Sequence, residues 1–171
     1  MNPLTQFKKI LILPLIIALA LVAVAALTAV PALATPPSGV TTVAIANGTF
    51  GELDIFTRTG DWKSRIDTKG ASDLYVLQNT VIPGGTLGWH SHPGPSLVIV
   101  VSGTASFYRA DDCTTPLVFQ APSQFVDNGN DVHLLRNEGN VNLVVVVVRL
   151  VPRGAAPRID QPNPNPGICP Q

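Results

Sequence analysis

Hydrophobic and polar positions divide the chain into an apolar N-terminal run and a longer region of short apolar segments separated by turns. From residue 40 onward, segments rich in β-branched and aromatic residues alternate with Gly, Asn, Asp and Pro, a pattern typical of short antiparallel strands. The pattern therefore predicts an all-β barrel or sandwich. The expected strands are Val40–Ala46, Phe50–Thr57, Leu74–Ile82, Leu97–Val101, Thr104–Arg109, Leu117–Gln120, Val132–Arg136 and Leu143–Val151.

Two of these segments lack polar alternation. Leu97–Val101 and Leu143–Val148 are apolar at successive positions, which predicts strands that are buried on both faces. The valines at 144–148 would promote aggregation if exposed, so we expect this strand to be central. The segment 152–171 contains six prolines. Such a segment is predicted to cross the surface as an extended tail and not to pair in a sheet.

The first 34 residues have the layout of a secretory signal peptide. Lys8-Lys9 precedes the apolar run Ile10–Val30, and the small-residue box Ala32-Leu33-Ala34 follows it. This order predicts cleavage before Thr35 and a secreted or otherwise extracytoplasmic protein. The apolar run is longer than the usual core of a signal peptide, so an uncleaved membrane anchor is the alternative.

The remaining chain is long enough for a single domain. We expect N-terminal strands over 35–71, the barrel core over 72–151 and the proline-rich tail over 152–171. Without the two lysines of the signal segment, acidic side chains outnumber basic ones by two. This balance and the lack of a basic cluster argue against nucleic-acid binding. Composition does not identify a small-molecule ligand, and it leaves both a monomer and a homodimer open.

The chain has two cysteines, Cys113 and Cys169. Export places both in an oxidising compartment, where an even pair predicts one disulfide. The bond would fasten the tail to the barrel and stabilise the fold by roughly 4 kcal/mol. Two unrelated buried or reactive thiols are the alternative.

Three histidines carry the candidate chemistry: His90, His92 and His133. Residues two apart in a strand project to the same face, so His90 and His92 can present their imidazoles side by side. Neutral imidazole binds Zn, Cu, Fe, Ni and Mn. On its own, however, such a pair is more often structural or solvent-facing than a metal site.

The surroundings of this pair resemble a known motif. Gly84-(x5)-His90-x-His92-(x3)-Ser96-(x6)-Gly103 is similar to the first motif of the cupin superfamily, in which a glutamate stands at the position of Ser96. The resemblance implies a double-stranded β-helix, the jelly-roll barrel of the cupins.

The second cupin motif is matched at its end. His133-(x3)-Asn137 resembles that end, although Asn128-Gly129-Asn130 replaces the P-x-G segment of the family. In the family, the histidines of both motifs bind one metal inside the barrel. The resemblance therefore implies a site formed by His90, His92 and His133.

The serine at position 96 changes the expected chemistry. Without the glutamate, the site is similar to that of the three-histidine thiol dioxygenases among the cupins, and Ser96 becomes a candidate to hold a metal-bound water. A protein exported unfolded collects its metal outside the cytoplasm, where selection follows intrinsic affinity, which rises toward Cu and Zn. We expect Zn, Cu or Mn in preference to Fe or Ni. Small-molecule binding, metal-dependent catalysis including dioxygenation, and a non-enzymatic domain with a vestigial site all remain open, and no catalytic residue is assigned.

Overall fold

The computed structural model describes residues 33–171. The predicted signal segment therefore lies, except for its last two residues, outside the described part of the chain. Within the described part, no helix has the length and apolar character needed to cross a membrane.

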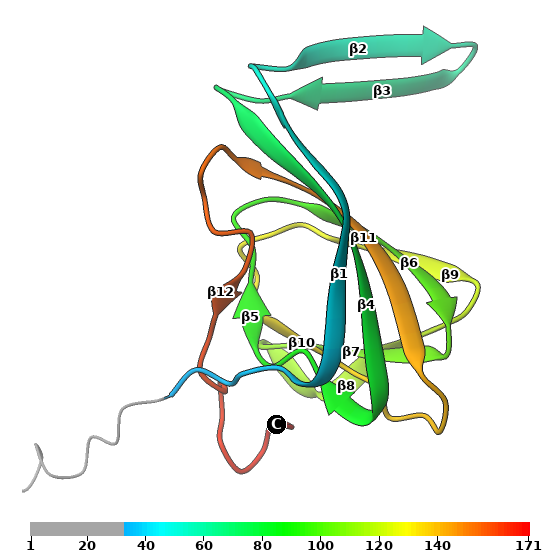
Figure 1. Cartoon of the computed structure of the whole chain (residues 1–171), viewed down its shortest axis with the longest axis vertical. Helices are drawn as coiled ribbons and strands as arrows, with labels where there is room; N and C mark the ends of the chain where they lie inside the picture. The colour runs from blue at the N-terminus through cyan, green and yellow to red at the C-terminus, as the bar shows by residue number, and fades with distance from the viewer. Residues whose placement is uncertain (1–32) are drawn as a thin grey trace, which may run out of the picture. The chain divides into compact units, whose positions relative to one another are not determined.

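Strands account for the regular structure of the described residues (Figure 1). Their bounds are β1 Ser38–Phe50, β2 Asp54–Thr59, β3 Trp62–Asp67, β4 Ser72–Thr86, β5 His90–Ser91, β6 Ser96–Ser102, β7 Thr104–Arg109, β8 Asp112–Gln120, β9 Ser123–Asp127, β10 His133–Arg136, β11 Leu143–Pro152 and β12 Ile159–Asp160. The prediction of an all-β fold is confirmed.

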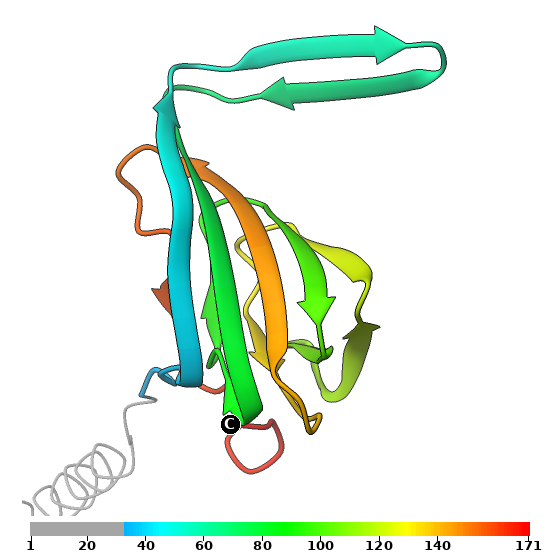
Figure 2. The same cartoon turned by 45° about the vertical axis from the view of Figure 1, so that its right-hand side comes forward.

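The strands form two runs that enclose a common interior. One run has the order β1-β4-β11-β6-β9, and the other has the order β12-β5-β10-β7-β8. The pairing of Arg136 with Thr86 joins β10 to the end of β4 and connects the two runs. Figures 1 and 2 show β1, β4, β11 and β6 side by side. The sheet is thus a nearly closed barrel, the double-stranded β-helix that the motif resemblance implied.

The valine-rich strand β11 is central, as predicted, because it pairs with β4 on one edge and β6 on the other. The prediction that β11 and β6 are buried on both faces is wrong. In β11 the residues from Leu143 to Val151 alternate between buried and half-buried, and in β6 Leu97, Ile99 and Val101 are exposed. Only one face of a barrel strand meets the core, so alternate apolar residues lie outside.

The barrel interior is filled by apolar side chains from both runs of strands. They are Val81, Val98, Val100, Ala105, Phe107, Leu135, Leu143, Val145 and Val147. Phe107 also stacks on the imidazole of His133, with ring centroids 5.0 Å apart. The apolar core therefore continues directly into the histidine cluster and fixes the position of one of its rings.

The N-terminal part differs in detail from the sequence prediction. The expected strand Phe50–Thr57 is divided, because β1 ends at Phe50 and β2 begins at Asp54. The β2–β3 hairpin closes through Gly60, whose φ of 59° suits a glycine in a tight turn. β1 pairs with β4 along its length and extends the barrel sheet, whereas β2 and β3 form a separate two-stranded sheet.

The proline-rich tail was not expected to pair in a sheet, and this expectation is wrong: Pro152 ends β11 opposite Ser72, and residues 159–160 form β12. Ile159 and Asp160 pair with Ser91 and His90, so β12 adds a short edge strand to β5. Both residues lie between Pro157 and Pro162 and keep their backbone N–H groups, which is why pairing is possible. The tail is also held by the disulfide between Cys113 and Cys169, the bond that the sequence predicted.

Candidate metal centre

Two short strands bring the three histidines together. His90 in β5 is the direct cross-strand partner of His133 in β10, and His92 follows β5 immediately. All three side chains are buried, and one nitrogen from each ring lies within 4.8 Å of the others. The ring centroids of His90 and His133 are 4.3 Å apart, and those of His90 and His92 are 4.7 Å apart.

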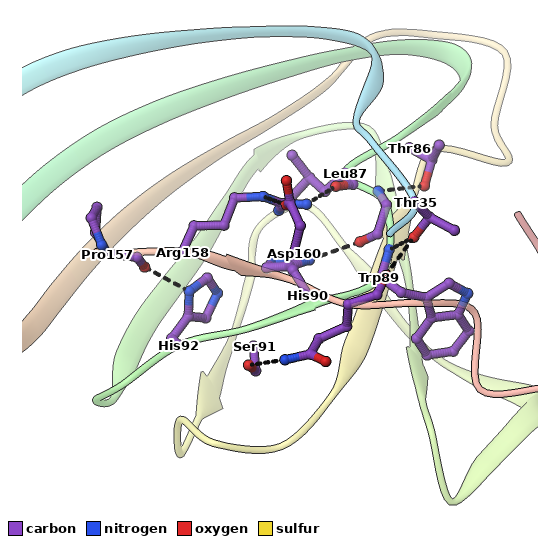
Figure 3. Close-up of polar contacts among 12 residues, drawn as sticks. Thr35, Thr86, Leu87, Trp89, His90, Ser91, His92, Pro157, Arg158 and Asp160 are labelled. Atoms are coloured by element: carbon purple, nitrogen blue, oxygen red, sulfur yellow. Dashed lines mark hydrogen bonds and ion pairs between the residues drawn. The ribbon is translucent and has the colours of Figure 1, made fainter. Parts of the chain in front are cut away.

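Backbone carbonyls fix the orientation of each ring. Nδ1 of His90 lies 2.8 Å from the carbonyl oxygen of Gly88, and Nδ1 of His133 lies 2.9 Å from that of Asp131. Nδ1 of His92 lies 2.8 Å from the carbonyl oxygen of Pro157, which Figure 3 shows beside the ring. A carbonyl only accepts, so each Nδ1 carries the proton and each Nε2 keeps its lone pair. This is the tautomer that a histidine ligand needs, and such outer hydrogen bonds are typical of metal-binding histidines.

Burial keeps the imidazoles neutral. Loss of solvation holds the pKa of His90 well below its usual range, and the nearby His133 adds to this effect. Burial, with the charge of Arg149, lowers the pKa of His92 to about 3. The pKa of His133 is also lowered by burial, although Asp127 opposes that shift. Neutral rings with a lone pair at Nε2 suit a metal ion, so the donor set fits the predicted site.

Ser96 is buried and lines the same cavity as the histidines, and its contact is with an arginine. The Ser96 hydroxyl accepts a hydrogen bond of 2.9 Å from Nε of Arg149. Nη2 of the same guanidinium donates to Nε2 of His92 at 2.9 Å. Burial lowers the pKa of Arg149 to about 10, so the side chain stays charged at neutral pH. A positive group therefore already contacts one of the three ligand nitrogens.

A buried carboxylate completes the cluster. Asp127, at the end of β9, is 5% exposed. Its Oδ1 accepts a hydrogen bond of 2.9 Å from the backbone N–H of Gly129. Its Oδ2 lies 3.6 Å from Nε2 of His92 and 3.8 Å from Nε2 of His133.

The loop between β9 and β10 positions these groups. Asn130 has a φ of 61° where the family motif has its glycine, and asparagine tolerates this left-handed conformation. Its N–H bonds to the carbonyl of His92 at 2.6 Å, which joins the two histidine segments. Gly129 has a φ of 80°, and a Cβ there would lie 2.6 Å from the carbonyl oxygen of Gly94. Backbone contact thus requires glycine at position 129.

Sequence reasoning did not identify Asp127 or Arg149 as site residues. Asp127 directly precedes the turn residues Asn128-Gly129-Asn130, but it is also a carboxylate six residues before His133. Arg149 ends the run of valines, and it shares the inward-facing alternation of Val145 and Val147. A charged residue at an inward position of an apolar strand was the available signal.

The space around the histidines is small. The cavity that they line has a volume of about 30 Å³, which holds one or two water molecules. A hollow of about 650 Å³ lies elsewhere, against Leu74, Leu97 and Leu150, and no histidine lines it. The three histidines, Asp127 and Arg149 therefore all line the smaller cavity.

Comparison with protein-family models agrees with the motif resemblance. The family model described as a cupin domain matches residues 79–149, which include all three histidines. Comparison with curated proteins gives no match. Among solved structures, a cupin-like protein from Thermotoga maritima is 19% identical with a TM-score of 0.47, over 54% of this chain and 68% of that one. A DMSP lyase from Ruegeria pomeroyi is 15% identical with a TM-score of 0.44, over 50% of this chain and 42% of that one.

Proposed function

This chain belongs to the cupin superfamily, and we propose that it is an exported protein that binds one divalent metal ion through Nε2 of His90, His92 and His133. The observation that carries the proposal is the hydrogen bonding of the three rings. Each Nδ1 is tied to a backbone carbonyl, so each neutral ring keeps its lone pair at Nε2 within one buried cluster, where that of His92 accepts a hydrogen bond from Arg149. Convergence of this kind is what a metal site requires.

Export is supported by the bond between Cys113 and Cys169. Disulfides persist in oxidising compartments and are rare in the cytosol. A chain that acquires metal outside the cytoplasm selects it by intrinsic affinity, which rises toward Cu and Zn in the divalent series.

The size of the cavity restricts what else can bind beside the metal. Room for one or two waters admits water, hydroxide or another ligand of that size in this arrangement. A bound metal supplies Lewis-acid activation of such a ligand, or redox chemistry where the ion is a redox metal. The same metal site therefore serves either to bind a small ligand or to catalyse its reaction.

A second candidate is a non-enzymatic cupin domain without bound metal. The contact that favours it is the hydrogen bond from Arg149 to Nε2 of His92, because the guanidinium occupies a lone pair that a metal would need. In this alternative, Arg149 is a permanent structural cation of the barrel.

Elemental analysis of purified protein, followed by titration with Zn²⁺, Cu²⁺, Mn²⁺, Ni²⁺ and Fe²⁺, tests the proposal. We expect one equivalent of metal in the wild type and loss of most of it in His90→Ala, His92→Ala or His133→Ala. Wild-type protein that takes up none of the five ions supports the second candidate. Oxygen uptake with thiols, catechols and diketones then separates oxygenase chemistry from binding.

A further inference from the structure

We infer that Asp127 is the fourth protein ligand of the metal site and supplies the carboxylate that the cupin motif carries at the position of Ser96. The inference rests on the proposed metal site and deepens it. Ser96 and Asp127 are direct partners in the antiparallel pair β6–β9. Side chains of directly opposite residues project to the same face of a sheet. The carboxylate is therefore displaced by one strand but still faces the barrel interior.

The geometry of Asp127 points to a ligand. Gly129 holds Oδ1, which leaves Oδ2 directed toward His92 and His133. Metal bonds of about 2.1 Å place neighbouring ligand atoms roughly 3–4 Å apart. The two Oδ2–Nε2 distances, 3.6 and 3.8 Å, fall in this range.

Oδ2 is also a buried acceptor that lacks a hydrogen bond. Among the described residues it has no hydrogen-bond partner, although it is shielded from solvent. A buried carboxylate oxygen without a donor is costly, and native structures rarely retain one without a reason. Both neighbouring Nε2 atoms carry lone pairs and cannot donate to it. A cation bound by these three atoms gives Oδ2 the partner that it lacks.

Charge balance favours the same assignment. Three neutral imidazoles contribute no negative charge, and the guanidinium of Arg149 lies 2.9 Å from Nε2 of His92. A divalent ion bound by histidines alone would face this buried positive group without compensation. The carboxylate of Asp127 offsets the repulsion directly.

A structural role for Asp127 makes a different prediction. Its charge attracts the guanidinium of Arg149 and partly offsets the lowering of the Arg149 pKa by burial. If Asp127 serves only as this counter-ion, its replacement alters metal affinity through the electric field and leaves the coordination sphere unchanged.

The test is Asp127→Asn, which keeps the shape of the side chain and an oxygen for the N–H of Gly129. We expect calorimetric titration to show Zn²⁺ affinity reduced by about 100-fold or more, since loss of an outer hydrogen-bond partner alone costs about 10–100-fold. The d–d absorption of bound Co²⁺ should also change, because a direct ligand is lost. The control is Asp111→Asn, the same chemical change at a side chain that is 77% exposed, and it should match the wild type.

A double variant keeps the test decisive. Asp127→Asn with Ser96→Glu returns the carboxylate to the opposite strand, so most of the lost affinity should be recovered. An Asp127→Asn protein with wild-type affinity overturns the inference and leaves the three-histidine site intact. Weaker binding with an unchanged Co²⁺ spectrum overturns it as well, in favour of the counter-ion role. A wild type that binds neither Zn²⁺ nor Co²⁺ overturns the proposed function itself.

Discussion

The Nδ1–H of His92 donates to the backbone carbonyl of Pro157, which lies 65 residues later in the chain. The same carbonyl accepts a hydrogen bond of 2.9 Å from Nη1 of Arg149. The next residue, Arg158, donates to the carbonyl of Leu87 at 2.6 Å (Figure 3). The C-terminal tail therefore sets the tautomer of one candidate ligand and holds the arginine beside it.

Removal of the disulfide should affect both stability and metal binding. In Cys113→Ser/Cys169→Ser, the free energy of unfolding should fall by up to ~4 kcal/mol, because the unfolded chain regains its freedom. Zn²⁺ should also bind more weakly, because the loosened tail orients His92 less well. Denaturant unfolding and calorimetric titration check these two effects. Reductant should reproduce both effects in the wild type and leave the double variant unchanged. Unaltered Zn²⁺ affinity in the double variant would show that the disulfide-held tail does not orient His92.

Replacement of the buried arginine should tighten metal binding. Arg149→Met removes a cation that competes for Nε2 of His92 while it retains most of the apolar stem. A hydrogen bond to a charged group is worth about 1.5–3 kcal/mol, so affinity for Zn²⁺ should rise by roughly tenfold or more. Arg153→Met, in the exposed part of the tail, is the matched control. A fall in affinity for Arg149→Met would mean that the guanidinium supports the metal site.

A methyl group added at Gly129, in the loop between β9 and β10, should shift the backbone and thereby disturb the site. Gly129→Ala combines a left-handed φ of 80° with a 2.6 Å approach to Gly94. Gly154→Ala has a similar φ of 74° but no atom within 4 Å of its added Cβ. Each should lose about 1–2 kcal/mol of stability from backbone strain.

The close contact adds a second cost at position 129. Gly129→Ala should be less stable than Gly154→Ala and should also bind Zn²⁺ more weakly, because the N–H of Gly129 orients Asp127. Thermal unfolding and titration of the two variants check this difference. Equal stability and equal Zn²⁺ affinity of the two variants would show that the loop tolerates the added methyl group without moving the carboxylate of Asp127.

The parts of the site that sequence predicts are those that depend on local spacing. His90 and His92 are two residues apart, so strand geometry alone places them on one face, and the motif resemblance adds His133. Asp127 reaches the site through the pairing register of β6 and β9, which no local pattern specifies. The carbonyl of Pro157 arrives through the course of the tail, which sequence described only as extended.

The same distinction applies to the fold. Turn residues and β-branched segments locate most strands, because these preferences act over a few residues. The valine run of β11 conceals its alternation, because identical side chains occupy both faces of the strand. Arg149 is in register with the inward-facing valines, but its charge does not identify that face as the interior from sequence alone.

Acid should destabilise the protein when it is freed of metal with a chelator. The folded pKa values of His90, His92 and His133 lie below the usual value of 6.5, so the unfolded chain binds more protons as pH falls. Stability is therefore complete above about pH 6.5 and declines below it. At pH 5, each histidine that stays neutral in the fold costs roughly 2 kcal/mol. Urea unfolding between pH 5 and pH 8 checks this, and equal stability across the range would contradict burial of neutral rings.

Anomalous diffraction from crystals of the Zn²⁺-loaded protein tests the metal site most directly. The account predicts a single strong peak at about 2.0–2.1 Å from Nε2 of His90, His92 and His133. A peak bonded to Nδ1 of any of these residues, a peak outside the barrel, or no peak at full Zn²⁺ saturation would contradict it.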